Sequence, residues 1–578
     1  MATTERQTKC FDAFVVALSQ ACDGGWKRWY VSTLELQLAS LDMCRACRSI
    51  SILHVNVTDE TPTSLWSPHE VQTRPDTCSS KIRESSGVAV VRAFRLTWAL
   101  PMEDLVRTAA IELWTSSECL ELKGSLCAGS LGSVVWPRGL THLVLDAPLG
   151  IPIRDVSWPM RLQRLVFGKF NQPIAGVVWP ASLQELLLGP KFNQPVAGVV
   201  WPASLQRLWF GSYFNPVVKE VASYFNQPIA EVIWPTSLLQ LWFGAHFNQP
   251  IAGVTWPKSL QGLSFGRCFD QPVVEVAWPT SLEMLRFGTR FNQPIAEVVW
   301  PVSLQQLVFG SNFNQPVAGV LWPASLRLLS FGLCFNQPIA EVVWPVSLQQ
   351  LLLGSNFNQP IAGIVWPASL RWLELGDKFN QPIAGVVWPT SLQGLELGGF
   401  SQAIDGVVWP ASLQQLSFGS NFNQPIAGVV WPASLQGLFF GMCFNQPITG
   451  VVWPASLQKL VFGLRFNQPI AGDVWPPSLQ KLVFGSDFNQ PLAGVIWPAS
   501  LQQLSFGSSF NQPIVGVVWP ASLQRLWFGT SFNQPLAWVV WPASLQQLSL
   551  GSAFNQPVAG VRWPRSLQTV TRCGTSLL

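Results

Sequence analysis

A repeated unit, marked by the dipeptide Trp-Pro, recurs along most of this chain of 578 residues. Trp-Pro occurs 20 times between Trp136 and Trp563, and the spacing along the sequence is 22 except for two intervals of 21 and one of 33. One unit can bury about six apolar side chains at about 1.5–3 kcal/mol each, whereas ordering its backbone costs about 1–2 kcal/mol per residue. A single unit is therefore unstable alone, and the period predicts a solenoid whose coils are stabilised by the coils on either side.

The order of residues within the unit predicts one short strand per coil. The segment Ser-Leu-x-x-Leu-x-Phe-Gly has apolar residues at alternate positions near its end, as a strand does, and its glycine indicates the turn that follows. The Trp-Pro and Gln-Pro bonds favour extended backbone before each proline and remove two amide donors. Little of the unit remains for an α-helix. We therefore expect a mainly β fold, a right-handed β-solenoid of about 20 coils with a period of 22, and a small mixed N-terminal region.

The unit resembles a known repeat family. Residues 422–426 read Phe-Asn-Gln-Pro-Ile, and the rest of this unit contains x-Pro-x-Ser-Leu-x-x-Leu-x-Phe-Gly. This combination resembles the FNIP repeat, a family regarded as leucine-rich-repeat-like, and Leu435, Leu438 and Phe440 are similar to the start of a leucine-rich repeat. The resemblance covers about residues 131–570. It implies a leucine-rich-repeat-like solenoid that binds proteins, sometimes joined to an F-box or signalling domain, and it implies no catalytic residues. The chain departs from the family by carrying Trp where the family usually has Leu before the second proline.

Charge and repeat together divide the chain into segments. Residues 1–130 hold 28 charged side chains, against 38 in the rest of the chain. Residues 101–114 have helical spacing with acidic residues in the first turn, which predicts a helix that caps the stack. The sequence that begins at Cys119 looks like a degenerate first strand. We expect four segments: a non-repeat region (1–100), a capping helix with a degenerate first coil (101–130), the FNIP-like solenoid (131–570) and a tail (571–578).

Composition limits the classes of function. Charged residues make up 11% of the chain, against about 25% in an average globular protein, and the net charge is +4, so nothing indicates a nucleic-acid partner. No apolar run approaches the roughly 18 residues of a membrane span, and Asp12 interrupts the apolar stretch near the N-terminus. We therefore expect neither a span nor a signal peptide. The 11 cysteines are odd in number and show no pairing pattern, which favours a reducing compartment, and we expect a cytoplasmic protein.

No pattern in the chain is typical of a catalytic or metal site. The four histidines lie outside any motif with a nucleophile or metal ligand, and no phosphate-binding or nucleophile-elbow motif occurs. Cys44 and Cys47 form a C-x-x-C pair, but a zinc site needs a second such pair. Cys268, Cys334 and Cys443 recur at one position in coils too far apart for disulfides between them. We expect no enzyme, no cofactor and no metal.

Positions that stay constant from coil to coil are expected in the core or at turns. Leu304, Leu307 and Phe309 represent the apolar core positions. The asparagine of Phe-Asn should form a ladder in which its amide bonds its own turn and the next coil. The serine present in 18 of 20 units should bond an amide of its turn. Asp270 places a charge in the asparagine ladder, and residues 400–405, which lack both the Asn and the Pro, predict a break in it.

Positions that vary from coil to coil are expected to face solvent. The most variable residue precedes the Phe-Gly that ends each strand, and the residue two positions earlier shares its side of the strand. In a leucine-rich-repeat arc this side is the concave, partner-facing surface, and here it repeatedly carries Trp and Arg, which are typical of binding hot spots. The predicted partner-binding residues are Trp209, Trp242, Arg286, Trp372, Glu374, Glu396, Phe439 and Trp527. The alternative is drift at tolerant positions of recently duplicated coils.

Two further features depart from the unit. Ser-Tyr-Phe-Asn at residues 212–215 recurs at 223–226, a partial duplication that explains the interval of 33 and should form a loop or kink the stack. Acidic residues replace the usual glycine before Val at Glu231, Glu275, Glu297 and Glu341. Glu275 and Glu297 lie in adjacent coils, as do Glu374 and Glu396. Two close carboxylates can bind a cation or perform acid–base chemistry, but a solvated surface is the simpler interpretation.

These observations favour a non-enzymatic scaffold that binds an unknown protein partner on its concave strand face. One alternative is a structural or cell-surface adhesion protein, since low charge and high apolar content suit self-association. Another is a substrate adaptor of a ubiquitin ligase, which needs an adaptor-binding domain within residues 1–110.

Overall fold

The computed structural model describes residues 52–57, 93–98, 118–123, 136–146, 152–211, 223–572 and 575–576. These residues form short strands joined by turns, with no helix among them. The fold is a parallel β-solenoid with one strand per coil, as the repeat predicts. Two compact units make up the chain: Met1–Gln249 with Val254–Leu260, and Pro250–Gly253 with Gln261–Leu578. The expected capping helix at 101–114 and the segment 212–222 lie outside the described residues.

The first unit contains eight described strands. They are β1 Ile52–Val57, β2 Ala93–Trp98, β3 Cys119–Lys123, β4 His142–Asp146, β5 Arg164–Phe167, β6 Glu185–Leu188, β7 Arg207–Phe210 and β8 Gln240–Trp242. Each strand pairs in parallel with the next. Strand β3 lies at the degenerate strand that the sequence indicates, and β1 and β2 extend the ladder before the repeat begins. Strands β7 and β8 stay in register, so the long interval between Trp201 and Trp234 does not interrupt the strand ladder.

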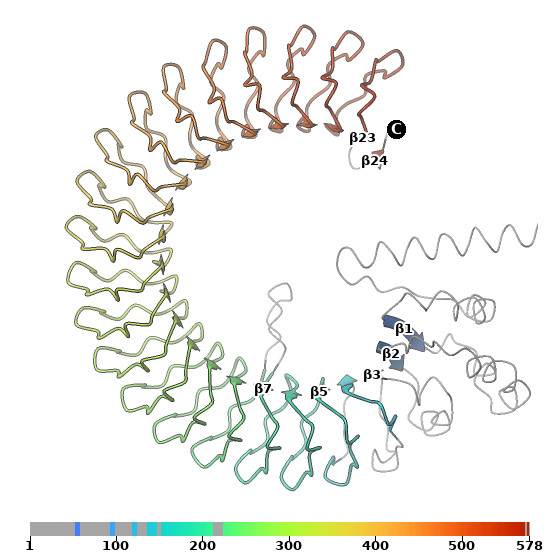
Figure 1. Ribbon diagram of the computed structural model, residues 1–578, viewed down its shortest axis with the longest axis vertical. Helices are drawn as coiled ribbons and strands as arrows, with labels where there is room; N and C mark the ends of the chain where they lie inside the picture. The colour runs from blue at the N-terminus through green and yellow to red at the C-terminus, as the bar shows by residue number, and fades with distance from the viewer. Residues whose placement is uncertain are drawn as a thin grey trace, which may run out of the picture. The chain divides into compact units, whose positions relative to one another are not determined.

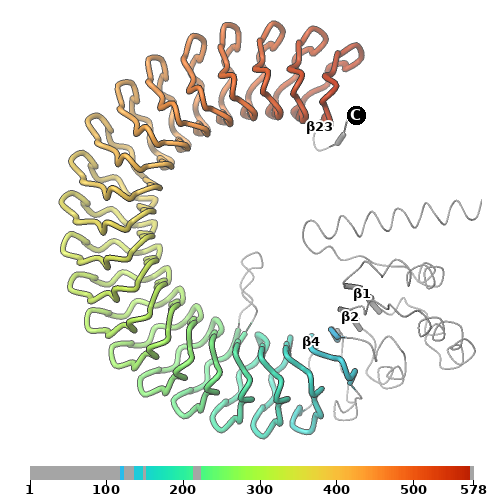
Figure 2. The backbone as a smooth tube through the Cα atoms, in the orientation of Figure 1, coloured from blue at the N-terminus to red at the C-terminus, as the bar shows by residue number. Residues whose placement is uncertain are grey.

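The second unit continues the same pattern. Its strands are β9 Gly262–Ser264, β10 Met284–Arg286, β11 Gln306–Val308, β12 Leu328–Ser330, β13 Gln350–Leu352, β14 Trp372–Leu375, β15 Gly394–Leu397, β16 Gln415–Phe418, β17 Gly437–Phe439, β18 Lys459–Val461, β19 Lys481–Val483, β20 Gln503–Ser505, β21 Arg525–Trp527, β22 Gln547–Leu550, β23 Thr569–Arg572 and β24 Thr575–Ser576. All pairings are parallel except that of β24 with β23. This unit is curved, with its strands on the concave side and its loops on the convex side (Figure 1, Figure 2).

The core of each coil is built from the residues that stay constant in the sequence. Leu304 and Leu307 are fully buried, and Phe309 is 3% exposed. The Phe309 ring stacks on Phe313, four residues on, with centroids 4.1 Å apart, and on Phe331 of the next coil at 5.7 Å. Because these contacts repeat from coil to coil, most of the apolar burial of a coil comes from its neighbours.

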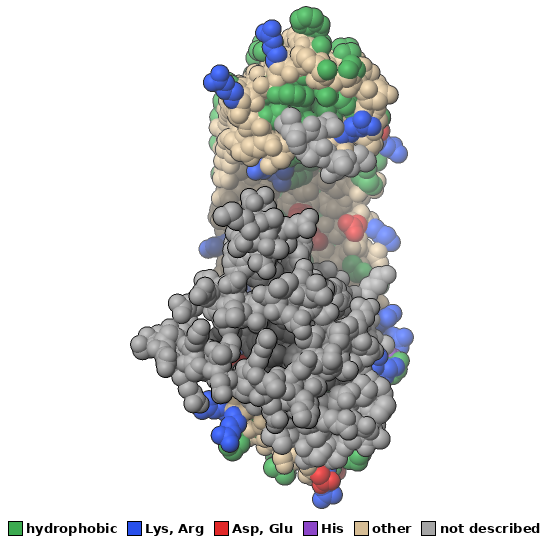
Figure 3. Space-filling model, turned by 90° about the vertical axis from the view of Figure 1, so that its right-hand side faces the viewer, with side chains coloured by type: hydrophobic (Ala, Val, Ile, Leu, Met, Phe, Trp, Pro, Cys, Tyr) green, Lys and Arg blue, Asp and Glu red, His purple; other side chains and the backbone are tan. Residues whose placement is uncertain are grey.

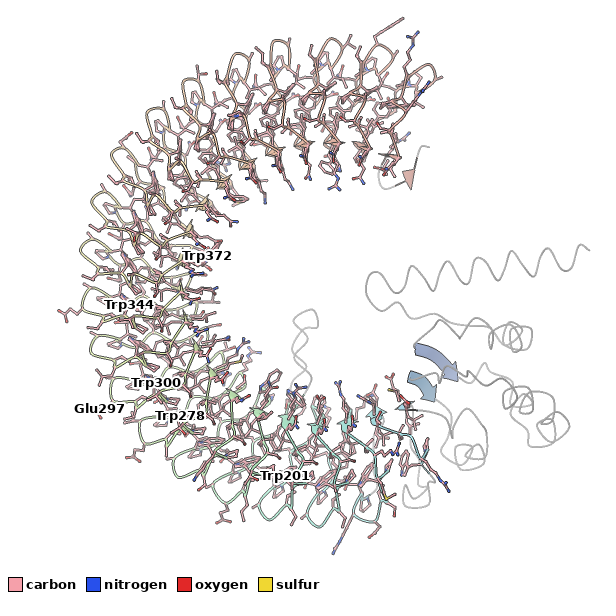
Figure 4. The ribbon with its side chains drawn as sticks, in the orientation of Figure 1. Trp201, Trp278, Glu297, Trp300, Trp344 and Trp372 are labelled. Carbon is pink, nitrogen blue, oxygen red and sulfur yellow. The ribbon has the colours of Figure 1, made fainter. Side chains whose placement is uncertain are left out.

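The tryptophan of each Trp-Pro forms a second column inside the coils (Figure 4). Trp300 is 5% exposed, and its ring centroid lies 6.4 Å from those of Trp322 in the next coil and Phe309 in its own. The indole Nε1 of Trp300 is buried without a hydrogen-bond acceptor among the described residues. Ring packing therefore holds this column.

The asparagine ladder joins successive coils as expected. The backbone N–H of Asn336 donates to Oδ1 of Asn314 in the coil before, at 2.9 Å. The side-chain Nε2 of Gln337 donates to the same oxygen at 3.1 Å. The asparagine oxygen thus accepts two hydrogen bonds from its neighbour, and the following glutamine reinforces the ladder.

The prediction that the repeated serine bonds an amide of its own turn is wrong. The Oγ of Ser325 donates to the carbonyl oxygen of Leu304 in the preceding coil at 2.8 Å. The amide of its own turn is already satisfied, because the N–H of Leu326 donates to the carbonyl of Pro323 at 3.1 Å. The hydroxyl is therefore left to form a second ladder between coils.

The two irregular members of the asparagine ladder still take part in it. Oδ1 of Asp270 accepts the N–H of Asn292 at 2.9 Å, so the position needs an acceptor and a carboxylate supplies one. The break predicted at 400–405 occurs on one side only. The N–H and Oγ of Ser401 both donate to Oδ1 of Asn380, at 2.9 and 3.1 Å. Toward the next coil, the described bond is that of Gln424 Nε2 to the backbone carbonyl of Ser401, at 2.7 Å, in place of the usual bond to an asparagine Oδ1. Ser401 therefore keeps the backbone donor of the asparagine that it replaces but not its side-chain acceptor.

Candidate functional site

The concave side of the second unit is formed by the solvent-facing side of its strands. In β14, Leu373 is fully buried, whereas Trp372 before it and Glu374 after it are half-buried. Side chains alternate across a strand, so the same arrangement recurs along the unit. We call the residues before the buried leucine the leading column and those after it the trailing column. Together, over β9–β22, they form the strand face, and Figure 4 shows Trp372 at this inner edge.

The eight predicted residues do not form one compact site. In the second unit, strand register brings Trp372 and Glu374 on β14 next to Glu396 on β15. Of the other three predicted residues of this unit, Phe439 on β17 lies two strands beyond β15, whereas Arg286 on β10 and Trp527 on β21 lie at least four strands from the group. In the first unit, Trp209 lies opposite Trp242.

The solvent exposure expected for Trp209 is wrong. Trp209 is 5% exposed, and its ring meets that of Trp242 edge-to-face with the centroids 5.5 Å apart. The parallel register of β7 and β8 places both rings on one side of the sheet, in contact with each other. Beside them, Arg207 forms an ion pair with Glu185, which also binds Nε of Arg164 at 3.5 Å. The large side chains of this region are therefore already partnered.

Glu374 and Glu396, here named the acidic pair, lie opposite each other and are both half-buried. Burial raises the pKa of both carboxyl groups, and the charges of Glu396 and Asp377 raise the pKa of Glu374 further. Among the described residues, no lysine or arginine forms an ion pair with either. A cavity of about 380 Å³ beside the pair is lined by Asp377, Leu397, Met442 and others. The pair is therefore more withdrawn from water than the solvated surface that the sequence indicates.

Lys459 and Lys481, here named the basic pair, lie opposite each other in the leading column of β18 and β19. Nζ of Lys459 lies 4.5 Å from the centroid of the Phe439 ring, within the range of a cation–π interaction. The sequence places both lysines on the strand face, but they were missed as candidate residues. Their signal is the tetrapeptide Gln-Lys-Leu-Val, which occurs in two consecutive units.

Glycines make room for the aromatic rings of the strand face. A Cβ added to Gly394 on β15 would lie 2.1 Å from the ring of Trp372, so the ring fills the space of the missing side chain. A Cβ added to Gly437 on β17 would lie 3.0 Å from the ring of Phe439. Both rings therefore rest against the sheet itself, which gives the face fixed apolar platforms.

Glu275, Glu297 and the cysteines at the equivalent position of three coils give no sign of chemistry. Glu275 and Glu297 are exposed, and Glu297 lies at the outer loop of its coil, far from the strands (Figure 4). In the part of the chain that the structure describes, no group of three or more His, Cys, Asp and Glu residues could hold a metal ion. Cys268, Cys334 and Cys443 form no disulfide. No helix among the described residues is long and apolar enough to cross a membrane.

A row of exposed aliphatic residues lies outside the strand face. The residue before each Trp-Pro tryptophan is largely solvent-exposed, as at Val343 (82%), Val365 (86%) and Val387 (80%) in adjacent coils. In the second unit this aliphatic row comprises Val299, Leu321, Val343, Val365, Val387, Val408, Val430, Val452, Val474, Ile496, Val518 and Val540. Figure 3 shows the charged side chains of the visible described surface mostly at its edges, some of them next to one another.

Comparison with known families gives the repeat its identity. The family described as FNIP Repeat matches residues 225–268, 247–290, 291–334, 335–378, 400–443, 444–487, 488–531 and 510–553, more than half of the chain. The chain belongs to the FNIP repeat family. Its fold is a repeat solenoid of the leucine-rich-repeat type, which is typical of protein-interaction scaffolds, and the family is typically non-enzymatic.

Solved structures contain similar solenoids. The FNIP-repeat chain is 32% identical to the protein described as CroV588, a novel circular LRR protein; the alignment covers 83% of this chain and 88% of that one, with a TM-score of 0.56. An internalin of Listeria monocytogenes is 15% identical over 50% of this chain and 80% of its own, with a TM-score of 0.34. A chain of the Drosophila Toll–Spatzle complex is 11% identical over 79% and 81%, with a TM-score of 0.46. No curated protein matches the chain.

Proposed function

We propose that this FNIP-repeat protein is a non-enzymatic scaffold that binds a protein partner on the strand face of the second unit. The observation that carries the proposal is the division within each strand: the buried leucine is constant, whereas the residues beside it vary and include half-buried Trp372, Phe439 and Trp527. Aromatic side chains on a rigid support are typical anchors of protein interfaces. Neither the acidic nor the basic pair has a described ion-pair partner within the chain, so both can contribute charge to an interface.

The test uses the full chain with Trp372→Ala and Trp527→Ala combined. Capture of the main partner from cells should weaken at least tenfold, about 1.4 kcal/mol, while the circular dichroism spectrum stays unchanged. The matched control is Trp538→Ala, because Trp538 is 82% exposed and lies outside the strand face. Loss of capture by the control alone, or unchanged capture by the double variant, would place the interface elsewhere.

A cytoplasmic location fits the same proposal. The 11 cysteines of the sequence are odd in number and show no pairing pattern, which is typical of proteins in reducing compartments. Imaging of the tagged full-length protein tests this placement, and secretion of the tag would contradict it.

Self-association through the aliphatic row is a second candidate function. Contiguous exposed apolar surface is uncommon on monomeric proteins and often marks an interaction site. If the row joins copies of the chain, Val365→Lys with Val387→Lys should lower the sedimentation coefficient at high protein concentration, while Gln306→Lys on the strand face should not. The ligase-adaptor alternative depends on residues 1–110, most of which lie outside the described residues.

A further inference from the structure

The strand face from β14 to β19 carries its charges in a fixed order. The acidic pair occupies β14 and β15, and the basic pair occupies β18 and β19. Between them, β16 and β17 present only uncharged residues, with Ser417 and Phe439 in the trailing column. This stretch of the second unit therefore has one negative end, one positive end and a neutral middle.

We propose that this stretch binds an extended segment of the partner that carries a Lys or Arg and an Asp or Glu about six residues apart, with apolar residues between them. The inference rests on the proposed function and names the chemistry of the partner. Parallel strands lie about 4.8 Å apart, so four strand spacings place the centres of the two charged pairs about 19 Å apart. An extended chain advances about 3.3 Å per residue, so about six residues span that distance.

The acidic end lacks a cation that the partner can supply. Like charges directly opposite each other on neighbouring strands destabilise a sheet, and Glu374 and Glu396 are opposite each other and half-buried. A guanidinium or ammonium group bound there would offset the repulsion and form charge-assisted hydrogen bonds. The adjoining depression of about 380 Å³ is open to solvent beside the pair and leaves room for the side chain of a Lys or Arg.

The basic pair and the uncharged strands between the two pairs complement the rest of the proposed partner segment. The ammonium groups of Lys459 and Lys481 belong to adjacent strands, and a carboxylate placed between them would neutralise the repulsion of this second like-charged pair. The Phe439 ring is held against Gly437, and Nζ of Lys459 lies 4.5 Å from its centroid, so the part of the half-buried ring left exposed offers an apolar contact for the residues in between. A nucleic acid fits this surface poorly, because its phosphates would meet the acidic pair.

Peptide selection on the full chain tests the inference directly. Random phage-displayed peptides of about 12 residues, selected at low ionic strength, should be enriched in sequences with a basic and an acidic residue about five to seven positions apart, in either order. The most enriched peptide, labelled with a fluorophore, then serves as the binding probe. Glu374→Gln with Glu396→Gln should weaken its binding at least tenfold, and so should Lys459→Gln with Lys481→Gln. The matched control, Glu231→Gln with Glu297→Gln, changes exposed carboxylates outside the strand face and should leave binding unchanged.

A charge reversal separates ion pairing from structural damage. Glu374→Lys with Glu396→Lys should abolish binding of the probe and should bind a version of it in which the basic residue is replaced by Glu. No enrichment, peptides without the spaced charges, or selection of oligonucleotides in place of peptides would overturn the inference. If capture of the cellular partner still depends on Trp372 and Trp527 in that case, the proposed function stands alone. If capture depends on neither residue, the proposed function fails as well.

Discussion

At the scale of single residues, the two glycines of a typical coil are required for different reasons. A Cβ added to Gly332, in the Phe-Gly turn, would lie 1.6 Å from the carbonyl oxygen of Gly310 in the preceding coil. Gly363, which precedes an aliphatic residue, has a φ of +77°, but nothing lies within 4 Å of an added Cβ. At Gly332, contact with the preceding coil leaves no space for a side chain. At Gly363, only the left-handed backbone conformation disfavours one. This open space explains how Glu341 and Trp538 can occupy the second position in other coils.

Substitution by alanine should separate these two glycines. Gly332→Ala should cost about 3 kcal/mol, the upper end for overpacking, because the obstacle is backbone rather than a movable side chain. Gly363→Ala should cost about 1 kcal/mol, since only a left-handed conformation must be strained. Urea unfolding of the two variants measures the difference. Equal losses would mean that coil spacing adjusts freely to an added methyl group.

The acidic pair predicts a pH dependence of stability. The pKa of both Glu374 and Glu396 is raised in the folded protein, mainly by burial, so the folded state binds these protons more tightly than the unfolded chain does. Their contribution therefore becomes more favourable as the pH falls through the folded-state pKa towards the ordinary glutamate value of about 4.3. Asp377 is the other acid that acts on Glu374, and the trailing column of the flanking strands β13 and β16 carries uncharged Leu352 and Ser417.

Removing both charges should show the sign of this effect. Glu374→Gln with Glu396→Gln should raise the urea midpoint at pH 7, and its advantage over the natural sequence should shrink on acidification to about pH 4.5. Asp377→Asn provides the comparison for a single neighbouring charge. An advantage that grows as the pH falls would mean that the carboxylates are stabilised in their ionised form.

At the scale of the strand, alternate side chains point to opposite sides, so core residues and solvent-facing residues are separate sets. Leu307 on β11 is fully buried, whereas Ser330 in the trailing column of β12 is half-buried. Leu307→Ala should cost about 2–5 kcal/mol, as core truncations do, and Ser330→Ala less than about 0.5 kcal/mol. Chemical denaturation of the full chain compares them. Similar losses would contradict the assignment of inner and outer sides.

The position of one strand in each coil was predictable because the same unit recurs about twenty times in the sequence. Two prolines and one alternating apolar segment in each repeated unit exclude a helix and select one strand, and repetition averages out local irregularities. The buried Leu307 and Phe309 and the bonds from coil to coil of the asparagine ladder follow from the same constancy.

Features that depend on a particular neighbour were not predictable in this way. Trp209 contacts the ring of Trp242 because β7 and β8 keep their register over an unusual interval, which the spacing along the chain does not show. The acceptor of the Ser325 hydroxyl is set by the carbonyl that the preceding coil presents. The cavity beside Glu374 depends on side chains from several strands, which spacing along the chain does not place.

At the scale of the whole molecule, the coils of the second unit depend on one another in series. Its strands pair only with their immediate neighbours, so a coil at the end has fewer stabilising contacts than one in the middle. The last repeat shows the consequence: Val558 is 36% exposed, whereas Ile514 at the equivalent position two coils earlier is fully buried. Figure 3 shows hydrophobic side chains at the upper end of the molecule in that view.

Hydrogen exchange should reveal this serial dependence. Amides of β22 and β23 should exchange faster than those of β17 to β19, because local opening at an end disrupts one interface between coils rather than two. Leu460→Ala on β18 removes a fully buried side chain and should accelerate exchange in β17 and β19 more than in β11. Equal acceleration of exchange in β11, β17 and β19 would mean instead that the second unit opens as one cooperative body. The strand face would then be either wholly present or wholly lost. Graded acceleration would mean that coils can open singly, so that binding at β14 to β19 survives damage at the end of the unit.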